Sequence, residues 1–300
     1  MLPRPILLTC QQLLAPIAVA QKKLDEIRTH SPADPKANLL REGLLVLAVS
    51  TVEYMLLDVL AVLLRQIPSK LPDKAFTVSK DSLVDPERDL LEEQIQQYLV
   101  GLSYKRLDEF IDAFCDRLSI SLLTYREKYG DSLQELKESR NLLIHNDLKT
   151  NSIYLAKAGR KARAQKTDVR LKIDIPYFTS SIEVLEELCS ACHTEIENKY
   201  QSFKKVKAVR ELWEYVFQTP ILGFDEYWEV DLSRDTLHLK TRDFHGGISS
   251  SEEIFLGVWL NHFNQIENDY IKRFSLLHLS QDSQSKMLWL LNVLKDFRVY

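Results

Sequence analysis

Apolar residues recur every three or four positions over most of the first two hundred residues, and this spacing predicts amphipathic or buried helices. The pattern predicts helices over about 8–28, 35–66, 87–101, 104–118 and 131–146, and a further helix from about 177 past 200. Glycine is scarce, with eight residues, whereas Leu, Glu, Lys and Gln are plentiful, and this balance favours helices over short strands. We therefore expect a mainly α fold.

The predicted helix over 35–66 is apolar on nearly every face and is long enough to cross a bilayer. It contains Glu53 and Asp58, however, and it is flanked by sequence typical of soluble domains. A helix of this kind is more often the central helix of a bundle. We expect Asp34 and Pro35 to cap its start, and we expect no membrane span.

The compartment is indicated by two features. Residues 5–20 end in Ala18-Val19-Ala20, which imitates a signal-peptide cleavage site, but Gln11 and Gln12 interrupt the apolar run. The four cysteines form no disulfide framework and fit a reducing environment. We therefore expect a cytoplasmic protein. The cysteines are Cys10, Cys115, Cys189 and Cys192.

The segment 151–174 carries β-branched and alternating residues and predicts a short β-hairpin inserted into the helical part. Its tip is basic: seven Lys or Arg residues and one Asp lie between Lys157 and Lys172. The formal net charge of the chain is −4, so any affinity for nucleic acid must come from such a local patch. The candidate contacts to an RNA backbone are Lys157, Arg160, Lys161, Arg163 and Lys166.

The pattern changes after about residue 210. Residues 228–232 and 237–239 alternate between apolar and polar types around Ser233-Arg234-Asp235, which predicts a second β-hairpin, and two or three helices follow. We therefore expect a helical domain over 1–210 and a small α+β domain over 211–300.

One helix carries candidate chemistry: Arg140-Asn141-Leu142-Leu143-Ile144-His145. Arg holds phosphate through several donors, and His exchanges protons near neutral pH. Arg140 projects from an apolar arc, so it needs a carboxylate partner, and Glu53 is favoured over Asp58. On an ideal helix Arg140 and His145 point about 140° apart, so they converge only across a cleft, at a frayed helix end or with a second chain.

Simpler interpretations stand beside this one. Arg140 also fits an ion pair at the edge of the core, with His145 near the last carbonyls of the helix. The spacing recurs as Arg273 and His278, where it reads as coincidence. Cys189-Ser190-Ala191-Cys192-His193 matches a haem-attachment pattern, but inside a helix these cysteines are more simply packing residues. No phosphate-loop, H-E-x-x-H or G-x-S-x-G string is present, and no metal site is evident.

The motif around Arg140 and His145, with Asn141 after the arginine, resembles that of the HEPN domain superfamily. The preceding acidic helix, with its string STVEYMLLDVL, is similar as well. The resemblance covers about 35–210. It implies an up-and-down helical bundle that forms a homodimer, with two Arg–His pairs meeting between the subunits. It also implies a metal-independent endoribonuclease without cofactor, as in toxins, antiphage systems and RNA processing.

In that hypothesis the RNA 2′-hydroxyl attacks the adjacent phosphate, His145 acts as general acid or base, and Arg140 stabilises the charge on the phosphate. Asn141 orients His145 or binds the phosphate, and Glu53 holds Arg140. Two alternatives remain open. Some members of the superfamily have lost catalysis, so the chain could be a helical interaction or sensor module with a protein partner or antitoxin. It could also bind nucleotides without cleaving them.

Overall fold

A computed structural model describes residues 7–32, 34, 36–72, 90–204, 226–231, 236–242 and 248–255. The chain divides into two compact units. One is Cys10–Ser202, and the other combines Met1–Thr9 with Phe203–Tyr300. The sequence places this boundary near residue 210.

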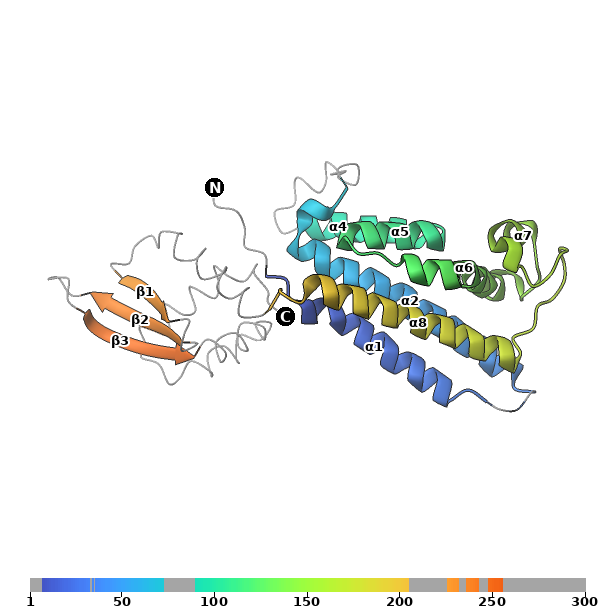
Figure 1. The fold of residues 1–300 in the computed structure, drawn as a ribbon, viewed down its shortest axis with the longest axis horizontal. Coiled ribbons are helices and arrows are strands. Elements are labelled where there is room, and N and C mark those ends of the chain that lie inside the picture. The colour runs from blue at the N-terminus through green and yellow to red at the C-terminus, as the bar shows by residue number, and fades with distance from the viewer. Residues whose placement is uncertain are drawn as a thin grey trace. The chain divides into compact units, whose positions relative to one another are not determined.

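The first unit is built of helices, as the apolar spacing predicts (Figure 1). The mainly α character of the fold is thus confirmed for the described residues. Two short 3-10 turns, Pro68–Lys70 and Gly159–Lys161, complete it. The α-helices are α1 Cys10–Thr29, α2 Asn38–Gln66, α4 Leu90–Ser103, α5 Leu107–Leu118, α6 Leu123–Asn146, α7 Ser152–Ala158 and α8 Ile175–Tyr200.

Helix α2 is the centre of the first unit. It contacts α1, α4, α5, α6 and α8, and Figure 1 shows α1, α2 and α8 side by side. Leu45, Leu56 and Leu60 are fully buried in its core face. By length and composition α2 is the one described helix that would also suffice to cross a membrane, and about half of its most apolar stretch is buried within the protein. Its packing is that of a core helix.

Two predicted helix starts are wrong. Asp131 does not open the motif helix, because α6 begins at Leu123 and continues through Gly130. Tyr125 before this glycine and Leu133 after it are both buried, so the two parts of the helix pack against the same core. Asp34 does not cap α2, which begins at Asn38. The Asp34 carboxylate instead accepts a hydrogen bond from the backbone of Lys36, in the turn before the helix. Pro35 lies outside the described residues.

The predicted hairpin over 151–174 is replaced by helix α7 and a 3-10 turn. Asn151 caps α7 by accepting a hydrogen bond from the backbone N–H of Tyr154 at 2.8 Å. Tyr154 and Ala158, four residues apart, are both buried on the inner side of this helix. One isolated antiparallel bridge joins Lys149 to Arg170. Helix capping and burial of one helical face therefore outweigh the β-branched residues of the segment.

In the second unit the structure describes three antiparallel strands in the order β1-β2-β3. They are β1 Glu226–Asp231, β2 Thr236–Arg242 and β3 Ile248–Phe255. Trp228 pairs with Leu239, in the place where the alternating pattern predicts a hairpin. The helices predicted after this sheet, and with them the α+β character of 211–300, lie outside the described residues and stay predictions.

The cysteines Cys189 and Cys192 lie within α8 and are fully buried. The Cys189 sulfur lies 3.7 Å from the sulfur of Met55 on α2. Burial raises the pKa of Cys189 to about 12, so it stays a neutral thiol. The interpretation of this pair as packing residues is therefore confirmed.

The core position of α2 leads to a paired prediction. Leu60→Ala removes a fully buried side chain and should lower the free energy of unfolding by about 2–5 kcal/mol. Val19→Ala, on the neighbouring helix α1 and 67% exposed, should change it by less than about 0.5 kcal/mol. Urea unfolding followed by far-UV circular dichroism measures both, and equal effects would contradict the burial of Leu60.

Candidate functional site

A groove of about 860 Å³ lies between α2, α4, α6 and α7. On α6 the lining includes three polar residues, spaced three and four apart along one side of the helix: Glu138, Asn141 and His145. Five cationic side chains and three carboxylates line the groove, so it is locally positive within an acidic chain. The cations are Arg65, Lys105, Lys137, Arg140 and Lys157, and the carboxylates are Glu53, Asp58 and Glu138.

Arg140 is bound to Glu53, the partner that the sequence favours. The Nη2 of Arg140 donates to Oε2 of Glu53, and the two side chains are 17% and 16% exposed. The Nη1 of Arg140 donates to Oδ1 of Asn141 at 3.1 Å. Burial lowers the pKa of Arg140, although a guanidinium stays charged at any physiological pH. The guanidinium is thus fixed in orientation in the lining of the groove.

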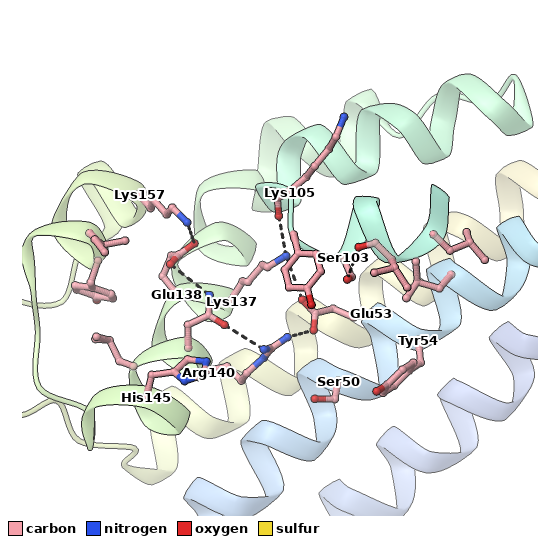
Figure 2. A pocket seen from close by; sticks show the side chains of 18 of the residues that line it. Ser50, Glu53, Tyr54, Ser103, Lys105, Lys137, Glu138, Arg140, His145 and Lys157 are labelled. Atoms are coloured by element: carbon pink, nitrogen blue, oxygen red, sulfur yellow. Dashed lines mark hydrogen bonds and ion pairs between the residues drawn. The ribbon is translucent and has the colours of Figure 1, made fainter. Parts of the chain in front are cut away.

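Glu53 also binds a second cation that the sequence did not single out. The Nζ of Lys137 lies 3.3 Å from Oε1 of Glu53 and donates to the backbone carbonyl of Lys105 at 3.1 Å. Figure 2 shows Lys137 and Arg140 of α6 both directed at Glu53 of α2. Burial lowers the pKa of Lys137, and nearby Glu138 counteracts this. A signal was present in the sequence, since Lys137 and Arg140 are three residues apart on one helix.

Asn141 and Glu138 extend the polar network along α6. Asn141 Nδ2 donates to Oε2 of Glu138 at 3.5 Å, and Gln134 Nε2 donates to Oε1 at 2.8 Å. The ammonium of Lys157 on α7 lies 3.9 Å from the same Oε1. Glu138 is almost fully buried, so these contacts offset the cost of keeping a carboxylate there. Among the residues of the predicted motif, Asn141 therefore bridges Arg140 to Glu138.

His145 lies in the last turn of α6, is exposed, and lines the same groove as Arg140. No hydrogen bond or ion pair joins the two within the described part of the chain. The helix does not fray after His145, because Asp147 and Leu148 form a left-handed turn and Leu148 is fully buried. Arg170 holds this turn by donating to the Asp147 carboxylate at 2.9 Å. Arg140 and His145 therefore face a common groove without direct contact.

The second candidate partner, Asp58, lines the groove one turn beyond Glu53 on α2. Burial raises the pKa of Asp58, and Arg65 partly opposes the shift. Two tyrosines reach the same groove and are largely exposed, Tyr54 on α2 and Tyr104 after α4. The groove therefore combines cations, carboxylates and accessible aromatic rings.

The five basic candidates for RNA contact divide into two groups. Lys157 lines the groove, and Arg160, Lys161 and Lys166 are exposed around the 3-10 turn that follows α7. Arg163 is different, because its side chain is 20% exposed and is held inside the fold. Its guanidinium is engaged within the chain, and its role as a contact to RNA stays a prediction.

Arg163 belongs to a buried cluster around Glu135 that sequence reasoning missed. The Oε1 of Glu135 accepts hydrogen bonds from Ser139, Tyr154 and Arg163, at 2.6, 2.8 and 3.0 Å. Its Oε2 accepts one from Tyr177 at 2.8 Å, and Arg163 stacks on the Tyr177 ring at 3.6 Å. Burial, followed by the nearby Glu135 carboxylate, raises the pKa of Tyr177. The cluster ties α7 and α8 to the motif helix, next to the groove.

The described residues hold no group of three His, Cys, Asp or Glu side chains that could bind a metal ion. The second Arg-x4-His pattern, Arg273 and His278, lies outside the part of the chain that the structure describes.

Comparison of the chain with protein-family models, with curated proteins and with solved structures gave no match. The chemistry of the groove therefore has to be argued from its own residues.

The two arginines of the basic segment provide a matched test of the Glu135 cluster. Arg163→Met leaves the buried Glu135 carboxylate without its cation and should lower the free energy of unfolding by about 3–5 kcal/mol. Arg160→Met removes a side chain that is 91% exposed and should change it by less than about 0.5 kcal/mol. Urea unfolding midpoints measure both, and a stable Arg163→Met protein would show that the cluster is not a structural tie.

Proposed function

We propose that this chain is a metal-independent endoribonuclease of the HEPN type, acting in the cytoplasm as a toxin or antiphage effector. The observation that carries the proposal is the placement of an oriented guanidinium, Arg140, and an exposed imidazole, His145, in the lining of one cation-rich groove. The resemblance to this superfamily implies a helical bundle, and the pairing of Arg140 with Glu53 is the one expected for an arginine that projects from an apolar arc. The imidazole is exposed, so it is accessible to a substrate in the groove.

The proposed reaction is an in-line transesterification. The 2′-oxygen forms a bond to phosphorus, the bond from phosphorus to the 5′-oxygen breaks, and a 2′,3′-cyclic phosphate and a 5′-hydroxyl result. A base takes the proton of the 2′-hydroxyl and an acid protonates the leaving 5′-oxygen, and His145 supplies one of these functions. Arg140 stabilises the charge that grows on the non-bridging oxygens, and Asn141 together with Glu53 fixes its orientation.

A homodimer is part of the proposal. Each chain contributes one Arg140 and one His145, so a reaction with two imidazoles needs a second copy. Exposed leucines on α2 outside the groove, Leu39, Leu40 and Leu47, form an apolar face that such a copy would cover.

The exposed basic residues after α7 would hold the RNA backbone without reading bases. Arg160, Lys161 and Lys166 keep this role in the proposal, and Lys157 reaches the groove itself.

A second candidate function is binding of RNA or nucleotides without cleavage, in a sensor or interaction module. One observation favours it: both terminal nitrogens of Arg140 donate hydrogen bonds within the chain, one to Glu53 and the other to Asn141. An arginine held in this way can position a phosphate while contributing little to the transition state.

The assay that decides between them compares the wild type with His145→Ala on total RNA in the presence of EDTA. We expect the wild type to cut without metal and to leave cyclic phosphate and 5′-hydroxyl ends. His145→Ala should lose about a hundredfold or more of the rate, the usual scale for a general acid or base. His193→Ala, a half-exposed histidine on α8 outside the groove, is the matched control and should cut normally. Equal cutting by His145→Ala would reject the assignment.

The dimer can be tested by mixing. If each active site needs His145 from two copies, wild type co-expressed with an equal amount of His145→Ala should retain about one quarter of the activity of the same total amount of wild type. A monomeric enzyme should retain about one half. Differently tagged copies and purification of each species measure the mixing, and activity linear in the fraction of wild type would contradict a shared site.

A further inference from the structure

We call the part of the groove lined by Glu53, Lys137, Glu138, Arg140 and Lys157 its floor. The floor carries more positive charge than its carboxylates neutralise. The single carboxylate of Glu53 serves two cations, with Arg140 on Oε2 and Lys137 on Oε1. The neighbouring Glu138 is already engaged by Gln134 and Asn141, and Lys157 approaches it to 3.9 Å. Three cations therefore face two carboxylates, and the floor holds one positive charge in excess.

The ammonium of Lys137 lines this part of the groove and has hydrogen-bond donors to spare. It has three N–H donors and donates one hydrogen bond, to the Lys105 carbonyl, whereas its contact with Glu53 is an ion pair at 3.3 Å. The Nε of Arg140 also lacks a partner among the described residues, but it is closed to solvent. A charged group with a spare donor in the groove lining, beside an excess of positive charge, points to an anionic ligand.

We propose that Lys137 is a second phosphate-binding residue and that one phosphodiester of the substrate sits between its ammonium and the guanidinium of Arg140. Glu53 then acts as a clamp that holds both cations at fixed positions before the substrate arrives. This inference rests on the proposed function, because it names the group that receives the scissile phosphate. It adds a residue that neither the motif nor its spacing indicates.

The competing explanation is that Lys137 only ties α6 to the turn after α4 through the Lys105 carbonyl. Its cost argues against this role alone. Lys137 is 7% exposed, and burial disfavours its charged form, so an uncharged residue would fill the space without a desolvation penalty. A charge kept at this cost and in the lining of a groove fits a binding role. The two explanations differ in one respect: only in a phosphate site does the contribution of Lys137 to the free energy of RNA binding depend on the charge of the substrate.

The test is a double-mutant cycle between Lys137 and the scissile linkage. The wild type first maps the cleavage position, and the oligonucleotides then carry a 2′-deoxy sugar there, which blocks cleavage. One oligonucleotide keeps the phosphodiester at this linkage, and the other has a neutral methylphosphonate. Binding is measured by fluorescence anisotropy for the full-length wild type, Lys137→Met and Lys137→Gln. Gln can still donate to the Lys105 carbonyl, so it keeps the fold if that tie is needed.

We expect the neutral linkage to weaken binding to the wild type about tenfold or more, the scale of a charge-assisted hydrogen bond. The Lys137 variants should distinguish the two linkages by less than about threefold, and the slope of affinity against salt should fall by about one. Lys128→Gln, an exposed lysine on the same helix but outside the groove lining, is the matched control and should keep the wild-type discrimination.

Two results would overturn the inference, and they are distinguishable. If the wild type cuts RNA but binds both linkages equally, or if the Lys137 variants discriminate as well as the wild type does, then Lys137 is not in the phosphate site, although the proposed function stands. If the wild type cuts no RNA, so that no cleavage position can be mapped, then the proposed function fails together with the inference.

Discussion

The carboxylate of Glu53 is the interaction on which the groove depends. It projects from α2, the most buried helix of the first unit, and it binds two cations from α6 at once. Without it, Lys137 and Arg140 would be two like charges three residues apart with little solvent to screen them. Because Glu53 sits on the core helix, the positions of both cations are set by helix packing and not by the mobility of long side chains. The packing of the core helix therefore also determines the geometry of the groove.

A second carboxylate, Glu135, fixes the other wall. Its four hydrogen-bond donors come from Ser139 on α6 itself, from Tyr154 on α7, from Arg163 and from Tyr177 on α8. Glu135 and Glu138 are three residues apart on α6, so the motif helix carries a structural carboxylate and a groove carboxylate on adjacent faces. The structural one holds α7 where Lys157 can reach the groove. The carboxylate that holds α7 in place and the carboxylate that contributes charge to the groove therefore lie within one turn of α6.

The sequence predicts the parts of this arrangement that depend on periodicity and on the cost of burying charge. The long helices agree with the predicted spans within a few residues at most ends, and the Arg140–Glu53 pair follows because an arginine in an apolar arc needs a carboxylate. Lys137 was missed because a lysine on a helix usually faces solvent. The Glu135 cluster was missed because Tyr154, Arg163 and Tyr177 lie 19, 28 and 42 residues away along the chain. Such contacts leave no local pattern.

The arrangement of Arg140 bears on the choice between an enzyme and a binding module. Electrostatic catalysis requires a guanidinium that is already oriented before the substrate binds. Glu53 orients Arg140 in this way, but its carboxylate also neutralises part of the positive charge of the guanidinium. A second cation on the same carboxylate restores that charge: Lys137 returns the balance around Glu53 to +1. Orientation and charge are then supplied by different residues, since Glu53 provides the first and Lys137 the second. A groove that only had to hold an anion would need no such division, because mobile surface lysines suffice for binding without specificity.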